Sequence, residues 1–199
     1  MRCKFRCLVT DLDGTLVSLP IVFDDIRNKV RAFLKTDHSL RPLAVSIPIV
    51  TGGNKDLMER VFKIIEEEEL KATTQAVYNP ELHDFLKRLK AKEFKLGLIT
   101  QQGQKPAEVA LKKMKIYELF DIIIARELVI DRTEQLRLAL KLLKAIPEET
   151  IYLGDSPMDL EAGVALNCFT VIVGERVPNA PLKIRRFVDI EKVIFDQET

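Results

Sequence analysis

Three short stretches of the sequence place acidic or hydroxyl side chains directly after an apolar run. They are Asp11-Leu12-Asp13-Gly14-Thr15, Thr100-Gln101 and Gly154-Asp155-Ser156, the last followed by Asp159. If the carboxylates of Asp11, Asp13 and Asp155 shared one crevice, their mutual repulsion would raise their pKa values unless a cation compensated. An all-oxygen set of ligands suits Mg²⁺, which proteins usually hold through one or two carboxylates. The residue types therefore predict a magnesium site, provided that the fold brings the stretches together.

The first and third of these stretches also have an ordinary structural explanation. The segment from Asp11 to Gly14 could be an Asx turn, and Ser156 could cap the helix that follows it. Zinc is not indicated, because His38 and His83 are isolated in the sequence and are expected near the surface. Chemistry at these positions thus depends on elements that carry all three stretches to one place.

Hydrophobic periodicity indicates what those elements are. Residues 5–10 form a short apolar run that predicts a buried strand, and from residue 79 onward strand and helix patterns alternate. The expected strands are 95–100, 121–125, 150–154 and 168–173, and the expected helices begin at Pro80 or cover 106–114, 134–144 and 158–166. This alternation predicts a doubly wound α/β fold with a mostly parallel sheet covered on both faces. Ligands bind at the carboxyl ends of such strands, where all three stretches lie.

The segment between the first strand and this regular series is too long for an ordinary crossover. Apolar residues at helical spacing predict helices over 21–35 and 54–70. We therefore expect an inserted helical cap at residues 19–78, placed over the carboxyl ends of the strands. The core domain would then consist of residues 1–18 and 79–199.

Two segments of this cap carry further interpretations. The acidic run Glu66–Glu69 is expected to be a solvent-exposed helix face. The turn Thr51-Gly52-Gly53-Asn54 has the composition of an anion-binding loop, but it can equally serve only to start the next helix, with Asn54 as N-cap. The cap contains no substrate signature.

The composition restricts the possible classes of function. Among the 199 residues, 31 Lys and Arg balance 30 Asp and Glu, so binding to nucleic acid through bulk charge is disfavoured. No apolar run approaches the ~18 residues that a membrane span needs, and the N-terminus lacks the apolar core of a signal peptide. We expect a cytoplasmic protein of open oligomeric state, in which Cys3 and Cys7 alternate with Phe5 in a strand and pack in the core.

The three stretches, in their order and strand context, carry a family resemblance. Asp11-Leu12-Asp13-Gly14-Thr15-Leu16 resembles the first motif of the haloacid dehalogenase superfamily. Leu96-Gly97-Leu98-Ile99-Thr100 is similar to its second motif, and Gly154-Asp155-Ser156-Pro157-Met158-Asp159 to its fourth. The agreement extends over residues 4–174, and three motifs in order are a far more specific signal than one. The resemblance implies a Rossmann-like core with an inserted cap, and the second acid, Asp13, points to the phosphatase branch.

The resemblance also implies a role for each acidic residue. Asp11 would attack phosphorus and form an aspartyl-phosphate intermediate, while Asp13 would protonate the leaving group and later deprotonate the hydrolytic water. Mg²⁺ would be held by the Asp11 carboxylate, the Asp13 backbone carbonyl and Asp155. Asp159 would support the water shell of the metal from a second layer, and Ser156 would do the same or only cap its helix.

The phosphate would be bound by the Thr100 hydroxyl and by backbone N–H groups near Leu12, Asp13 and Gln101. The sequence departs from the family at its third motif, because residues 129–136 lack the usual Lys. Arg132 is the nearest cation, although its planar guanidinium is not equivalent to an ammonium group.

Other arrangements at the third motif remain open. Arg132 could instead pair with Glu134 in solvent while Lys105 reaches the phosphate, or the site could have no cation at all.

Taken together, these features predict a Mg²⁺-dependent phosphatase that hydrolyses a small phosphorylated metabolite. Two alternatives remain. A phosphomutase would use the same two acids, and a phosphate-binding regulator could have kept the fold while losing activity. The motifs leave the substrate open between phosphoglycolate, a sugar phosphate and a nucleoside monophosphate.

Overall fold

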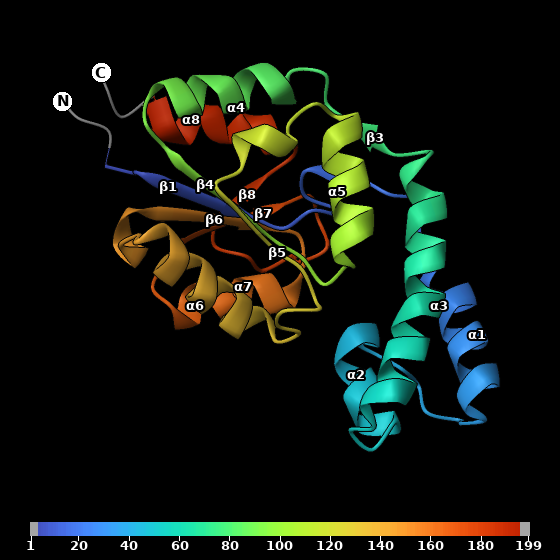
Figure 1. Ribbon diagram of the computed structural model, residues 1–199. Coiled ribbons are helices and arrows are strands. Elements are labelled where there is room, and N and C mark those ends of the chain that lie inside the picture. Colours follow the sequence, from blue (N-terminus) through green and yellow to red (C-terminus); the bar gives the residue numbers. More distant parts are fainter. Residues whose placement is uncertain (1–3, 196–199) are drawn as a thin grey trace.

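The computed structural model describes residues 4–195, and its centre is a six-stranded parallel sheet with the order β5-β4-β1-β6-β7-β8. The strands are β1 (Cys7–Thr10), β4 (Lys95–Ile99), β5 (Ile122–Ile124), β6 (Thr150–Gly154), β7 (Phe169–Val173) and β8 (Lys183–Ile184). The helices around it are α4 (Leu82–Ala91), α5 (Gln104–Lys113), α6 (Arg132–Leu143), α7 (Pro157–Ala165) and α8 (Ile190–Phe195). Helices α4 and α8 cover one face, and α6 and α7 cover the other (Figure 1). The expected doubly wound α/β fold is confirmed.

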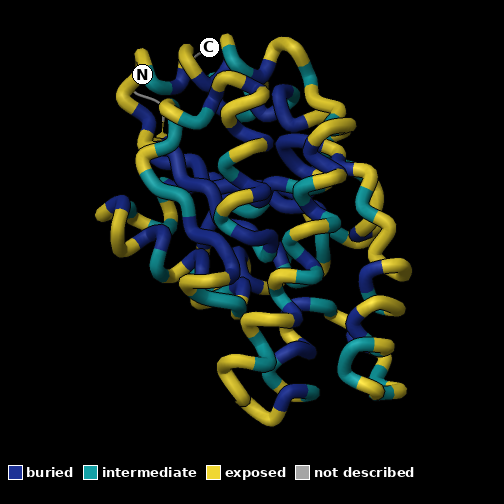
Figure 2. The backbone as a smooth tube through the Cα atoms, turned by 45° about the vertical axis from the view of Figure 1, so that its right-hand side comes forward, coloured by how far each residue is buried: buried dark blue, intermediate teal, exposed yellow. Residues whose placement is uncertain are grey.

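The central strands are apolar at nearly every position because both of their faces are covered by helices. On one face, Leu8 of β1 packs with Leu86 of α4 in the larger core cluster. On the opposite face, Val9 packs with Leu136 of α6 and Tyr152 of β6. Figure 2 shows the buried backbone concentrated in this sheet. Cys7 is buried in the same core, as expected, whereas Cys3 lies outside the described residues.

The register of the sheet determines where the three polar stretches emerge. β1 lies between β4 and β6, and its last residue, Thr10, is paired with Leu98 on one side and with Leu153 on the other. The chain therefore leaves these three parallel strands at the same edge. Asp11, Thr100 and Asp155 follow immediately after this edge.

Residues 19–76 contain three helices, α1 (Phe23–Leu34), α2 (Leu43–Val50) and α3 (Lys55–Thr73), which lie to one side of the sheet (Figure 1). They share a separate apolar core formed by Ile26, Val30, Leu40, Ile47, Val61 and Ile65. A two-stranded antiparallel ribbon of β2 (Val17–Ser18) and β3 (Val77–Tyr78) joins them to the sheet. The N-cap prediction is confirmed, because the Asn54 side chain accepts a hydrogen bond from the Leu57 N–H at 3.0 Å.

Some elements were not predicted. Helix α2 is apolar at most positions and contains Pro48, so it shows no 3.6-residue periodicity and has a residue that usually ends helices. The strands β2, β3 and β8 are two residues long, too short for a pattern to form. Within residues 4–195, no helix combines the length and apolar character that a membrane crossing would require.

Candidate active site

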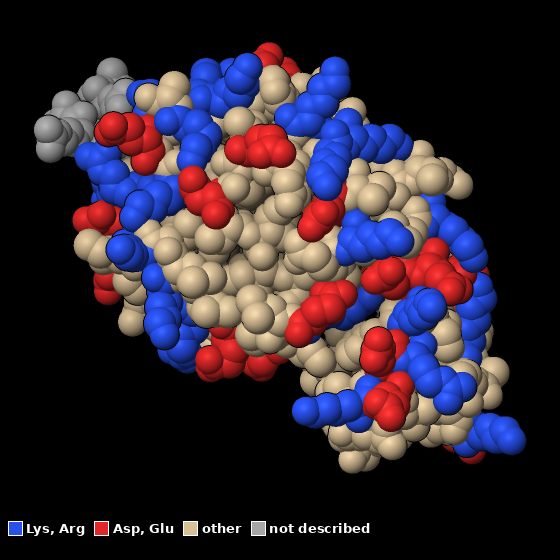
Figure 3. Space-filling view, in the orientation of Figure 1, with Lys and Arg blue, Asp and Glu red and all other residues tan. Residues whose placement is uncertain are grey.

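Residues at the three strand ends line one side of a cavity of about 260 Å³, and residues of the α1–α3 segment line the other. Carboxylate oxygens of Asp11, Asp155 and Asp159 lie within 4.8 Å of one another, and all three residues are buried. Of the three carboxylates predicted to cluster, Asp11 and Asp155 belong to this group, whereas its third member is Asp159 and Asp13 lines the same cavity. On the face shown in Figure 3, positive and negative side chains are interspersed, including those around the junction between the sheet and the α1–α3 segment.

Arg132 is the cation that faces Asp11. Its Nη2 donates a hydrogen bond to Asp11 Oδ1 at 2.9 Å, Nη1 donates to the Ile99 carbonyl at 3.0 Å, and Nε lies 3.2 Å from Asp159 Oδ1. The residue is 7% exposed, so it is inside the site rather than in solvent. Helix α6 begins at Arg132, two residues before the predicted start, and the N-cap Asp131 fixes this first turn.

The structure does not contain the alternative arrangement in which Arg132 pairs with Glu134 and Lys105 reaches the phosphate site. Glu134 pairs at 3.2 Å with Arg137, on the solvent-exposed side of α6. Lys105 is exposed on α5 and does not line the cavity. The geometry therefore favours Arg132 as the cation near Asp11.

Burial raises the pKa of Asp11, and Arg132 opposes this effect while Asp159 and Asp155 add to it. Burial also raises the pKa of Asp13 to about 6, although Oδ1 of Asp13 accepts a hydrogen bond from the Leu19 N–H at 2.9 Å. Carboxyl groups with raised pKa values that face one another bind a cation readily, because the cation removes the repulsion between their charged forms. The residues present fit Mg²⁺.

Asp155 is held by a residue that the sequence did not indicate. Arg176, which follows β7, donates from Nη1 to Asp155 Oδ2, and it lowers a pKa that burial raises. The loop after β1 lies against the same carboxylate. A Cβ atom on Gly14 would be 2.1 Å from Asp155 Oδ2, and the φ angle of Gly14 is +83°, so both space and backbone conformation require glycine.

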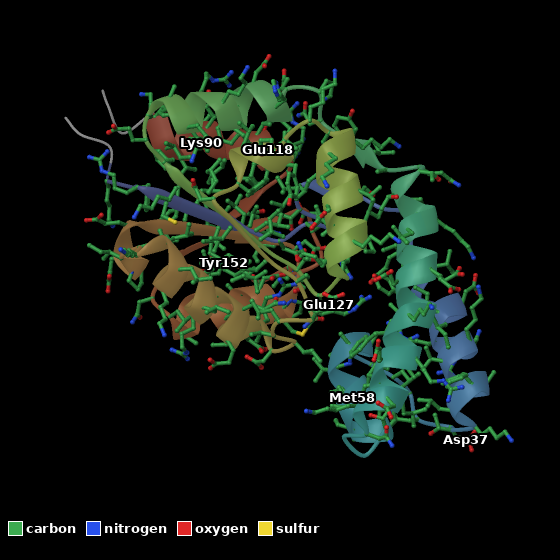
Figure 4. All side chains as sticks on the ribbon, in the orientation of Figure 1. Asp37, Met58, Lys90, Glu118, Glu127 and Tyr152 are labelled. Carbon is green, nitrogen blue, oxygen red and sulfur yellow. The ribbon has the colours of Figure 1, made fainter. Side chains whose placement is uncertain are left out.

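Asp159 is fully buried and has protein partners on both oxygens. Oδ2 accepts hydrogen bonds from the backbone N–H groups of Asp155 and Ser156, at 3.2 and 3.1 Å, and Oδ1 accepts one from the Tyr152 hydroxyl. Ser156 and Asp159 form a capping box at the start of α7. Figure 4 shows Tyr152 between the sheet and the α6–α7 layer. This network fixes the loop that carries Asp155.

The predicted phosphate-binding residues lie at the same edge of the sheet. Thr100 is buried, and its hydroxyl accepts the Gln102 N–H at 3.1 Å, while Gln101 lines the cavity. Leu12 is fully buried, so only its backbone can face a ligand. Gln135 is a residue that sequence reasoning missed. Its Nε2 donates to the carbonyls of Thr100 and Val129 and so connects the loop after β4 with the loop before α6.

The prediction for the acidic run Glu66–Glu69 is wrong at its last residue. Glu69 is 4% exposed, because α3 meets the sheet edge there. Its Oε1 accepts a hydrogen bond from Arg126 Nη1, and its Oε2 accepts the Gly103 N–H at 3.2 Å. Glu69 and Arg126 both line the cavity, and sequence patterns indicated neither.

Comparison with known proteins agrees with this geometry. The profile of the haloacid dehalogenase-like hydrolase family matches residues 8–173. A pyrophosphatase PpaX from Bacillus thuringiensis is 28% identical over 178 residues, covering 80% of this chain and 79% of that protein.

Two solved structures illustrate the shared fold. A β-phosphoglucomutase from Clostridium difficile superposes with a TM-score of 0.75 at 20% identity, covering 98% of this chain and 96% of that one. A predicted phosphoglycolate phosphatase from Haemophilus somnus gives 0.71 at 18% identity, covering 97% and 99%. The expectation of a phosphatase-type hydrolase is confirmed, and the chain belongs to the haloacid dehalogenase-like hydrolase family.

Proposed function

We propose that this hydrolase is a Mg²⁺-dependent phosphatase that cleaves a small phosphomonoester through an aspartyl-phosphate intermediate. The observation that carries the proposal is the buried Asp11 carboxylate, paired with Arg132 at the point where three strand ends meet in one cavity. Asp13, a second carboxyl group with a raised pKa, lines the same cavity, and this feature favours an enzyme over a protein that only binds phosphate.

Asp11 is the proposed nucleophile. Its carboxylate attacks phosphorus and displaces the substrate alkoxide, which splits one difficult hydrolysis into two easier steps. Arg132 holds Oδ1 of Asp11 and lowers the pKa that burial raises, which favours the ionised carboxylate that the attack requires. When bound, Mg²⁺ would neutralise charge between the carboxylate and the phosphate, with Asp11, Asp155 and the Asp13 carbonyl as its protein ligands.

Asp13 is the proposed acid and base. A carboxyl group with a pKa of about 6 can carry a proton near neutral pH and still release it to a leaving alkoxide. After the alcohol has left, the ionised Asp13 can take a proton from the water that attacks the aspartyl-phosphate. The Thr100 hydroxyl and the backbone N–H groups near Leu12 and Gln101 would hold the phosphoryl oxygens.

We also propose that the two parts of the chain have different roles. Residues 1–18 and 79–199 would form the catalytic core, and residues 19–78 would form the cap that selects the substrate. Strands β2 and β3 pair with each other at the two places where the chain passes between the proposed core and the proposed cap, which supports this division. A cavity of about 260 Å³ lies below the usual range for small-molecule sites, which favours a small phosphorylated metabolite as the partner.

The test is a release assay for inorganic phosphate over a panel of small phosphomonoesters, with Mg²⁺ and with EDTA. We expect turnover that EDTA abolishes. Asp11→Asn, which is nearly isosteric but not nucleophilic, should lose several orders of magnitude in kcat while keeping its fold. Retention of more than a few per cent of activity by Asp11→Asn would exclude Asp11 as the nucleophile. A need for a bisphosphate activator, with little phosphate released, would indicate a phosphomutase instead.

A further inference from the structure

A second polar cluster lies on the cap side of the cavity, next to the proposed phosphate site. Arg126 follows β5 and Gln102 follows Thr100 by two residues; both line the cavity, with exposures of 3% and 6%. Four buried side-chain atoms here have no hydrogen-bond partner within the described residues: Nε and Nη2 of Arg126, and Oε1 and Nε2 of Gln102. Buried polar groups are nearly always paired, so these atoms point to a ligand group.

The contacts of Arg126 show which side of its guanidinium is left for that ligand. Nη1 is already used, because it donates to Glu69 and to the Gln101 carbonyl at 3.2 Å. The Phe62 ring lies 5.2 Å from Arg126 Cζ and restricts the orientation of the guanidinium. The Nε–Nη2 edge remains, and this edge can donate two parallel hydrogen bonds to the two oxygens of a carboxylate.

The charges around the cavity favour an acidic group over a neutral one. Besides Arg126, three arginines line it, namely Arg27, Arg132 and Arg176. Four acids line it as well, Glu69 and the three aspartates at positions 11, 13 and 155. Asp11, Asp155 and Glu69 already pair with Arg132, Arg176 and Nη1 of Arg126. Among the described residues the Nε–Nη2 edge of Arg126 has no hydrogen-bond partner, and a carboxylate on the substrate would supply one.

We propose that Arg126 and Gln102 form a specificity subsite for a carboxylate on the leaving group of the substrate. The proposal rests on the proposed phosphatase function and narrows its substrate class to phosphorylated hydroxy acids. Arg126 contacts Gln101, so the subsite lies beside the phosphoryl group rather than on it. Glu69 acts as a positioning residue, because it holds Nη1 and leaves the opposite edge for the substrate.

Three phosphomonoesters with two carbons each provide a matched test, because they differ only in the group at the far carbon. Phosphoglycolate carries a carboxylate, ethyl phosphate a methyl group and phosphoethanolamine an ammonium group. The wild-type enzyme should show a kcat/KM for phosphoglycolate at least tenfold above that for ethyl phosphate, with phosphoethanolamine lowest. Gln102→Leu should reduce this preference at least fivefold, as should the charge-balanced pair Arg126→Gln with Glu69→Gln. Lys105→Ala, which alters an exposed residue nearby in sequence, should preserve it.

Two readouts separate the subsite from a structural role and from the phosphatase proposal. Gln102→Leu should raise the Tm while it lowers the preference, because it removes buried amide atoms that lack partners. Calorimetry with the inactive Asp11→Asn variant should show tighter binding of phosphoglycolate than of ethyl phosphate. Equal hydrolysis of the three esters, or an unchanged preference in both variants, would overturn the subsite. No hydrolysis of any ester would contradict the phosphatase function, and the calorimetry would still decide on the subsite.

Discussion

Removing the Arg132 side chain should damage both catalysis and stability, because it leaves two buried carboxylates without their cation. Arg132 lies 2.9 Å from Asp11 Oδ1 and 3.2 Å from Asp159 Oδ1. At an effective dielectric constant of about 20, each contact is worth roughly 5–6 kcal/mol of attraction before desolvation is subtracted. Breaking a buried pair by deleting one partner costs about 3–5 kcal/mol in measured cases. We expect a loss of stability of that size for Arg132→Ala.

The catalytic effect should be separable from this loss of stability. For Arg132→Ala we expect kcat/KM to fall at least a hundredfold, about 2.7 kcal/mol, because the charge on the phosphoryl group and Asp11 is no longer balanced. Arg132→Lys should retain part of the activity, since a shorter cation can still reach one carboxylate. The assay is steady-state phosphate release at saturating Mg²⁺, at a temperature where urea unfolding shows each variant to be folded.

Two control variants make the result decisive. Arg137→Ala removes an exposed arginine from the same helix and should leave both quantities near the wild-type values. Near-wild-type kinetics in Arg132→Ala would refute the reasoning. A comparable defect in Lys105→Ala would transfer the role to that residue.

Three further predictions concern the carboxylates and their metal. Asp155→Ala should weaken Mg²⁺ binding, so that the Mg²⁺ concentration for half-maximal activity rises at least tenfold; superimposable Mg²⁺ titrations of the variant and the wild type would show that Asp155 is not a metal ligand. Gly14→Ala should abolish most activity and lower the Tm, because its Cβ would lie 2.1 Å from Asp155 Oδ2 at a φ of +83°; a fully active variant would contradict this. In EDTA, the protein should lose stability as the pH rises from 4 to 7. The pKa of Asp13 is raised by folding from 3.8 to about 6, so the folded state binds more protons in this window, and the loss reaches up to about 3 kcal/mol. Urea unfolding at several pH values measures it, and Asp13→Asn should flatten the slope; an unchanged slope would show that another group is responsible.

The sequence predicted the part of the site that depends on local pattern. The strand ends carrying Asp11, Thr100 and Asp155 follow from short apolar runs, and parallel pairing then brings them together without further information. Residues that act through contacts between distant segments could not be found in this way. Glu69 has the local pattern of a solvated acid, and its burial depends on Arg126, 57 positions away.

Arg176 illustrates the same limit. It follows β7 by three residues and has an exposed side chain, so no periodicity distinguishes it from an ordinary surface arginine. A rule that examined polar residues after every strand, rather than after three of them, would have selected both Arg126 and Arg176. Helix α2 was missed for another reason, since a uniformly apolar segment with an internal proline gives no helical signal.

The position of β1 in the sheet has a consequence for synthesis of the chain. This strand is made first, yet both of its neighbours come much later, because Cys7 is paired with Lys95 and with Thr150. The three helices α1–α3 have their apolar core within residues 26–65, so their contacts can form while the rest is still being translated. Strand β1, together with Asp11, must wait for β4 and β6 to leave the ribosome. The segment that carries the proposed nucleophile is therefore synthesised well before both of its partner strands and finds its native partners late.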